Sequence, residues 1–131
     1  DGAKAVSNNS LSSQEKDTES KTNSIPTEKD YEDTAPMLDF RKAAFEEYEK
    51  GQMLRFKAQA WLIVGKRVTV NTKKDDVWGY TEDTAYLDFE STPEILVNDI
   101  MWVYGKYNGI MNIAGNRFPI INVDHFGVVD N

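Results

Sequence analysis

The sequence has no cysteine, a single histidine and only four prolines. Without cysteine the chain forms no disulfide and offers no thiolate to a metal ion or a substrate. No stretch approaches the ~18 consecutive apolar residues with which a helix crosses a bilayer. A serine nucleophile elbow, a phosphate-binding glycine loop and an HExxH zinc motif are missing as well. We therefore expect a protein that is not an enzyme and that holds no cofactor and no metal ion.

Positive charge is also scarce. The 131 residues include 22 Asp and Glu against 15 Lys and Arg, which gives a net charge of -7 at neutral pH. Such a chain repels a phosphate backbone at long range, so nucleic acid is disfavoured as a partner. At ~100 to 200 residues per domain, the length leaves room for one domain and a tail.

The first 35 residues have the composition of a disordered tail. They contain 13 Ser, Thr or Asn and 12 charged residues, but only four bulky apolar side chains. Such a stretch buries too little surface to offset the entropy cost of ordering it. We expect residues 1–35 to form a tether and residues 36–131 to form the folded domain. The tail is similar to the spacer that follows a removed export signal in bacterial surface lipoproteins, with an ordinary flexible terminus as the alternative.

The folded part is predicted to contain one helix and five strands. Apolar side chains at positions 40, 44 and 48 indicate an amphipathic helix over residues 38–50, with Asp39 as its N-cap and Gly51 just past its end. Alternation of apolar and polar residues then indicates strands. A polar loop is expected over residues 73–83. The predicted strands cover residues 54–62, 67–71, 84–90, 100–104 and 117–126.

Five short strands in about a hundred residues favour a closed antiparallel barrel. The fold class is therefore mainly β, an OB-like five-stranded barrel preceded by one helix. A β-sandwich, which normally needs about seven strands, is the alternative. We predict a core made of Phe40, Ala44, Leu54, Phe56, Val68, Val70, Leu87, Phe89, Ile100, Trp102, Ile121 and Val123.

Four segments together resemble a known group of small domains. They are YEKG at residues 48–51, NTKKDD at 71–76, AYLDF at 85–89 and EILVNDIMWVYGKYNG at 94–109. The resemblance is to the tRNA-anticodon-binding-like OB-folds of exported Gram-positive lipoproteins, and it extends over residues 39–126. It implies an OB fold and an extracellular location, with membrane attachment through a removed N-terminal lipid anchor. It implies no catalytic residues.

Exposed aromatic side chains are the most promising candidates for a binding site. Trp61 lies on the polar face of its strand, while Trp78 and Tyr80 lie in the polar loop. Aromatic rings on an OB barrel stack on bases or sugars. Basic residues of the first strand would add charge to such a site. The tentative binding residues are Trp61, Trp78, Tyr80, Tyr86, Arg55 and Lys57.

Two other features are given ordinary roles. The acids Asp75, Asp76, Glu82 and Asp83 could supply oxygen ligands to Ca²⁺, but their spacing does not match an EF-hand, so a solvated loop is favoured. His125, the single histidine, has no partner near it in sequence with which to act as a general base.

Two functions remain open. The first is a monomeric, non-catalytic interaction module at the bacterial cell surface, which recognises a protein or an envelope component. The alternative is a single-stranded nucleic-acid binder that uses Trp61, Tyr86 and the Arg55/Lys57 row. That alternative predicts steep salt dependence of binding.

Overall fold

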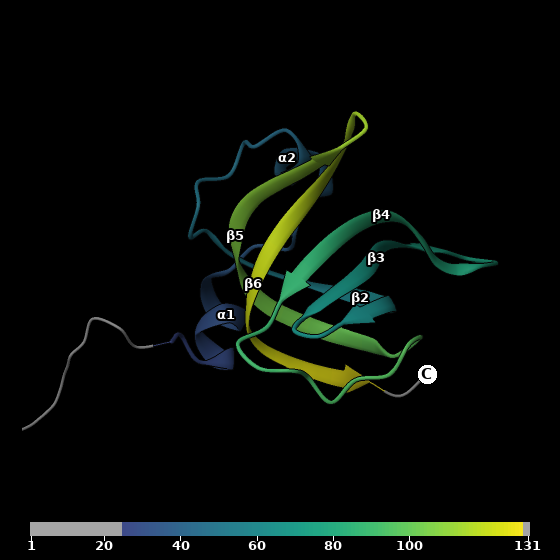
Figure 1. Ribbon diagram of the computed structural model, residues 1–131. Coiled ribbons are helices and arrows are strands. Elements are labelled where there is room, and N and C mark those ends of the chain that lie inside the picture. Colours follow the sequence, from purple (N-terminus) through teal and green to yellow (C-terminus); the bar gives the residue numbers. More distant parts are fainter. Residues whose placement is uncertain (1–24, 130–131) are drawn as a thin grey trace, which may run out of the picture.

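The computed structural model describes residues 25–129, which form a β-barrel with two short helices (Figure 1). The helices are α1 (Glu28–Thr34) and α2 (Phe40–Ala44). The strands are β2 (Met53–Val64), β3 (Arg67–Asp75), β4 (Gly79–Asp88), β5 (Ile100–Ile113) and β6 (Asn116–Val129). Neither helix of the described part is long and apolar enough to span a membrane.

The strands close in the order β2-β3-β4-β6-β5, and β5 returns to β2. All neighbours are antiparallel except β4 and β6, which run parallel over three residue pairs. Five strands in a closed Greek-key barrel are the arrangement of the OB-fold. The predicted fold class is thus confirmed, and the sandwich alternative is wrong.

Strict alternation along the strands builds the core. In β2 the side chains of Leu54, Phe56, Ala58 and Ala60 point inward and are buried. In the other strands the same alternation buries Val68, Val70, Ala85, Leu87, Met101, Val103 and Ile121. Most of the predicted core is confirmed by these positions.

Four predicted core residues are only partly buried: Phe40, Ile100, Trp102 and Val123. In β5 both faces are apolar, so periodicity alone did not show which one points inward. The structure turns Met101 and Val103 into the barrel and leaves Trp102 outside, stacked on Tyr104 with ring centroids 6.4 Å apart.

The predicted polar loop at residues 73–83 is wrong, because most of it belongs to strands. β3 and β4 stay paired as far as Asp75 and Gly79, so the two strands form a ribbon that projects from the barrel (Figure 1). Asp75 accepts the backbone N–H groups of Val77 and Trp78 at 2.7 and 2.9 Å, which closes the turn. Turn chemistry rather than apolar periodicity therefore holds this ribbon.

The predicted helix at residues 38–50 is also wrong beyond its first turn. Asp39 caps α2 as expected, but the helix ends at Ala44 and Glu46 adopts a positive φ of 60°. Glu46, Glu47 and Glu49 would lie at the negative end of a longer helix, which is unfavourable. Gly51 does not cap the helix; its N–H donates to the carbonyl of Tyr107 beside β2.

The folded domain begins before residue 36, so the predicted boundary is too late. Thr27 and Asp30 form a capping box that starts α1. The Tyr31 side chain is 0% exposed, and its hydroxyl donates to Asp124 at 2.5 Å. A single buried tyrosine thus anchors α1 to the barrel. The composition of residues 1–35 had predicted that this segment belongs to a disordered tail. Residues 1–24 of that tail lie outside the described residues.

Gly105 is required where β5 packs on β6. A Cβ atom at this position would lie 2.5 Å from the Asn122 carbonyl oxygen and 2.6 Å from Ile121 Cγ2. We expect Gly105→Ala to lower the free energy of unfolding by about 1 to 3 kcal/mol through overpacking, as measured by urea denaturation. Gly127→Ala is the matched control, because nothing lies within 4 Å of its added methyl. Equal stability of the two variants would contradict this account.

The Tyr31 hydroxyl supplies a second test. We expect Tyr31→Phe to lower the free energy of unfolding by about 1.5 to 3 kcal/mol, because a partly buried hydrogen bond to a carboxylate is lost. Burial, then the hydrogen bond to Asp124, raises the pKa of Tyr31 above its ordinary value. Stability from this group is therefore complete below pH ~10 and is lost as the pH rises further. Urea denaturation at neutral pH and above pH ~10 should show the difference between wild type and variant shrinking.

Candidate functional site

Four neighbouring strands bring one side chain each to a row on the outside of the barrel. The pairings place Leu62 of β2 beside Thr69 of β3, Thr69 beside Tyr86 of β4, and Tyr86 beside Ile120 of β6. We call these four residues the outer row. They face away from the core because their neighbours Val68, Leu87 and Ile121 point inward, and of the four Thr69 is itself buried, at 5% exposed. Leu62 and Ile120 are aliphatic, Thr69 is polar, and Tyr86 is the aromatic residue of the row.

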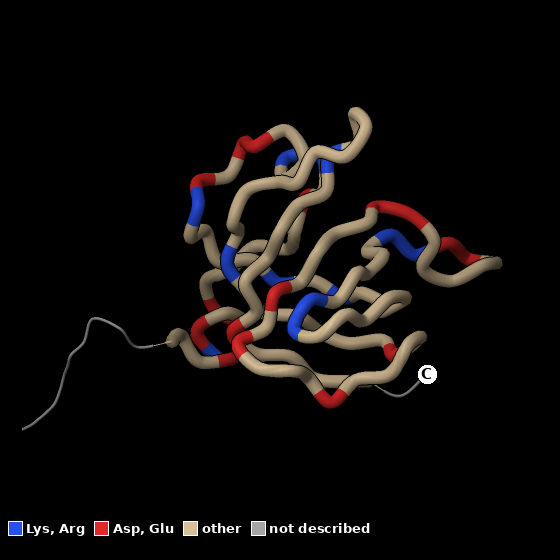
Figure 2. The backbone as a smooth tube through the Cα atoms, in the orientation of Figure 1, with Lys and Arg blue, Asp and Glu red and all other residues tan. Residues whose placement is uncertain are grey.

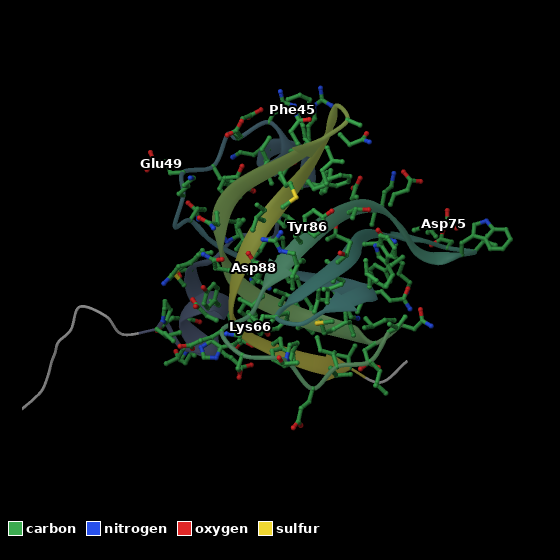
Figure 3. The ribbon with its side chains drawn as sticks, viewed as in Figure 1. Phe45, Glu49, Lys66, Asp75, Tyr86 and Asp88 are labelled. Carbon is green, nitrogen blue, oxygen red and sulfur yellow. The ribbon has the colours of Figure 1, made fainter. Side chains whose placement is uncertain are left out.

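Tyr86 contacts an aromatic side chain and a cation. The rings of Tyr86 and Phe118 on β6 meet edge to face, with ring centroids 5.6 Å apart and an interplanar angle of 73°. The Arg67 guanidinium carbon lies over the Tyr86 ring, 5.3 Å from its centroid. Figure 3 shows Tyr86 at the centre of this face, between Phe45 and Lys66. The ring is thus fixed and remains partly exposed.

Arg67 is itself fixed by a two-pronged ion pair. Its Nε and one terminal nitrogen donate to the two carboxylate oxygens of Asp88 at 2.7 and 2.9 Å. The hydrogen bond to Asp88 raises the pKa of Arg67 above its ordinary value. Fork-shaped pairing of this kind fixes the plane of a guanidinium as well as its position. Arg67 therefore lies over Tyr86 with much of its charge compensated.

Trp61 lies next to the outer row because β2 is irregular there. The register with β3 shifts between Ala60 and Leu62, so Trp61 is an extra residue in its strand. Trp61 and Leu62 are consecutive and both exposed, at 48% and 45%. Val64, two residues further, is exposed as well. The structure therefore brings two of the predicted site residues, Trp61 and Tyr86, to the same side of the barrel surface.

The other predicted site residues lie elsewhere. Trp78 is 79% exposed at the turn of the β3–β4 ribbon, and Tyr80 pairs with Lys74 on the same ribbon, where burial raises its pKa. Arg55 is occupied, since its Nε donates to the Ala35 carbonyl at 3.0 Å. Lys57 belongs to the part of β2 that pairs with β5, opposite Trp102. The Arg55/Lys57 row thus lies on the stretch of β2 that pairs with β5, and the binding role of the predicted site residues stays a prediction.

Phe118, Arg67 and Asp88 are the site residues that the sequence analysis missed. The two-residue turn at Gly65 and Lys66 pairs Val64 with Arg67. The contact of Arg67 with Asp88 depends on the register of the next hairpin, which the sequence analysis did not predict although both residues lie in predicted strands. The Phe118 contact crosses to β6, far along the chain. No local signal could have supplied that pairing.

The surrounding charges are unevenly distributed. Figure 2 shows acidic residues on α1, in the loop after α2 and on the β3–β4 ribbon, which also carries Lys73 and Lys74, whereas the β2–β3 turn is basic. Beyond Asp88 the face runs into a groove of about 780 Å³ with an aromatic floor of Phe89 and Phe126. Its charged lining residues are Asp88, Glu90, Glu94 and Asp124. Asp88 is paired with Arg67 and Asp124 with Lys106, so the remaining negative charge of the groove comes from Glu90 and Glu94, and it disfavours a phosphate group there.

The loop acids and the histidine have structural contacts. Backbone N–H groups of Trp78 and Val77 lower the pKa of Asp75, whose carboxylate closes the ribbon turn. Within residues 25–129, no group of three or more His, Cys, Asp or Glu side chains is placed to hold a metal ion. The His125 Nε2 atom lies 2.6 Å from the Pro26 carbonyl oxygen, to which it can donate.

No family model matches the chain, and no curated protein matches it. Among solved structures, the chain is similar to telomere capping protein Ten1 from Saccharomyces pombe, whose crystal structure is known. The two sequences are 13% identical and the TM-score is 0.48. The match covers 72% of this chain and 81% of that chain. The OB-like barrel expected from the sequence is confirmed, whereas the exported Gram-positive lipoprotein context finds no support in these comparisons.

Two expectations are corrected by this finding. We expected a module that recognises a protein or envelope component at the cell surface, and we expected nucleic acid to be disfavoured as a partner. The similar protein is named for telomere capping, which matches neither expectation, so both are withdrawn. The error has a physical origin, because net charge is a sum over the whole chain. Within residues 25–129, α1 and residues 73–83 together carry eight acids against three bases, and the other described residues carry as many bases as acids.

Proposed function

We propose that this OB-like domain binds single-stranded nucleic acid across the outer row, without catalysing a reaction on it. The observation that carries the proposal is Tyr86, a partly exposed ring in contact with Phe118 and Arg67 on the outer face of the barrel. In an OB-fold the second and third strands present the face that binds oligonucleotides, and here those strands are β3 and β4. Bases of any identity stack on such rings because every base has a π-face.

Stacking rather than charge would supply most of the affinity. Arg67 is paired with Asp88, so few cations remain beside the row, chiefly Lys66 in the β2–β3 turn and Lys73 further along β3. Lys73 is only loosely paired with Glu82, at 4.0 Å. The steep salt dependence expected from the sequence is therefore replaced by a shallow one.

Removing the Tyr86 ring tests the proposal directly. We expect Tyr86→Ala to weaken binding of a fluorescent oligodeoxythymidine by about 1 to 3 kcal/mol, the typical contribution of one stacked base, as measured by fluorescence anisotropy. Tyr86→Phe keeps the ring and should bind as wild type does. Trp78→Ala is the matched control, since it removes an exposed aromatic side chain from the ribbon turn. Undiminished binding by a folded Tyr86→Ala variant would refute the assignment of the site.

The salt dependence supplies a second test. With about two or three phosphate contacts, the logarithm of the association constant should fall with the logarithm of salt concentration at a slope of about -1.4 to -2.1. Anisotropy titrations from low to moderate salt measure this slope. A slope several times steeper would show that a larger basic surface, away from the outer row, does the binding.

The expected location outside the cell, on a lipid anchor, is a separate question and stays a prediction. It is supported by the composition of the N-terminal segment and by the resemblance to exported OB domains. Fractionation of cells that express the complete gene, followed by protease treatment of intact cells, would test it. Recovery of the protein solely from the protected cytoplasmic fraction would contradict the prediction.

A further inference from the structure

An exposed phenylalanine between two arginines lies at the end of α2. Phe45 is the C-cap residue of α2, and it is 49% exposed. The guanidinium carbon of Arg41 lies 4.9 Å from the centroid of its ring, and that of Arg117 lies 5.3 Å from it. Arg41 comes from α2 and Arg117 from the start of β6, so two separate elements converge on one ring. We call Arg41, Phe45 and Arg117 the arginine cluster.

Contact with an aromatic ring leaves a guanidinium group able to bind an anion. The donors of arginine lie in the guanidinium plane and match the geometry of phosphate oxygens. A ring within ~6 Å positions the cation without using those donors. Arg117 also reaches the Ala44 carbonyl at 3.5 Å, which steadies it further. The cluster thus holds two positive charges beside one ring with donors to spare.

One acidic residue competes for this charge. The Glu46 carboxylate lies 3.8 Å from a terminal nitrogen of Arg117, and both side chains are substantially exposed. An exposed ion pair of this kind is weak and readily exchanged. A phosphate group can therefore replace Glu46 as the partner of Arg117.

The arginine cluster lies across the edge of β6 from the outer row. Arg117 and Phe118 are consecutive on β6, so their side chains point to opposite faces of the strand, and Phe118 contacts Tyr86. Within the described residues β6 pairs with β4 only over residues 120–122, so the β6 edge beside Arg117 and Phe118 is open. Figure 3 shows Phe45 above Tyr86, near the β5–β6 hairpin and on the opposite side of Tyr86 from Lys66. The acidic groove begins at Asp88, two residues along β4 from Tyr86. A nucleic-acid strand stacked on Tyr86 therefore meets negative charge beyond Asp88, and it meets positive charge where it passes around the edge of β6 at Phe118.

We infer that Arg41 and Arg117 bind a phosphodiester group of the strand whose bases stack on the outer row. This inference rests on the proposed function and adds a direction to it: the strand leaves Tyr86 along β6 toward α2. The Phe45 ring keeps the two guanidinium groups together, and Glu46 weakens their hold on the phosphate. Binding should then depend on strand length, because only a longer strand reaches from Tyr86 to the cluster.

The test compares two lengths of oligodeoxythymidine, about 4 and about 12 residues, which lie within the range of OB-fold site sizes. We expect Arg41→Gln and Arg117→Gln each to weaken binding of the longer oligonucleotide about five- to tenfold, and its salt slope to shrink by about 0.7 for each lost contact. Binding of the shorter one should not change. Lys29→Gln removes one exposed charge from α1 and serves as the matched control. Thermal melts establish that each variant is folded.

Glu46→Gln gives a result of opposite sign. Removing this competing carboxylate should strengthen binding of the longer oligonucleotide and leave the shorter one unaffected. If wild type binds both lengths and the two arginine variants bind the longer one as wild type does, the inference is overturned while the proposed function stands. If wild type binds neither length, both fail. Equal losses in the arginine variants and in Lys29→Gln would show a general charge effect and also overturn the inference.

Discussion

The barrel closes through the parallel pairing of β4 with β6, and the candidate site depends on this closure. Only three residue pairs make the seam: Tyr86 with Ile120, Leu87 with Ile121, and Asp88 with Asn122. Because successive side chains of a strand point to opposite faces, the middle pair enters the core and the outer two pairs face solvent. The same three pairs therefore complete the core and bring the Tyr86 ring beside β6. A shift of one residue in this register would exchange the two faces.

Local contacts decide the electrostatics of the face. The chain is strongly acidic as a whole, yet Asp88 is engaged by Arg67 and Asp75 closes a turn. The acids of α1 lie on the helix that Tyr31 anchors to β6 through Asp124. The basic residues are distributed differently: Lys66 and Arg67 lie at one end of the outer row, while Arg41 and Arg117 meet at Phe45. Net charge consequently describes how the whole molecule interacts at long range. The local contacts determine the electrostatic interactions of a nucleic-acid strand that touches the surface.

Much of the fold could be predicted from the sequence, and the departures have specific causes. The alternation in β2 and β3 identified the strands and their buried faces, since a half-buried strand needs apolar residues at every second position. β5 is apolar on both faces, so the pattern could not show that Trp102 lies outside. The acidic end of the predicted helix was a signal against its length, but apolar spacing at Phe40, Ala44 and Tyr48 concealed it. The projecting ribbon was missed because its two arms are polar and are joined by a turn that Asp75 closes.

The candidate site was less predictable than the fold. Trp61 and Tyr86 were identified because large rings at polar-face positions are visible in a linear sequence. Their neighbours were not identified, because Arg67, Asp88 and Phe118 come together through pairings that span two hairpins and the closure seam. Similarly, the contact of Arg117 with Phe45 joins the end of a short helix to a strand 72 positions later. Such contacts between distant residues cannot be predicted from the periodicity of the sequence.

By itself the sequence determined which residues could be buried in strands, and hence that five strands form a barrel, because apolar alternation is a local property of each strand. Only the tertiary structure decided which outward-facing side chains meet and which charges are compensated. It also decided that a polar segment beginning near residue 28 belongs to the domain. These outcomes depend on strand register and on single long-range contacts such as that of Tyr31 with Asp124. A contact between distant residues leaves no trace in composition or spacing.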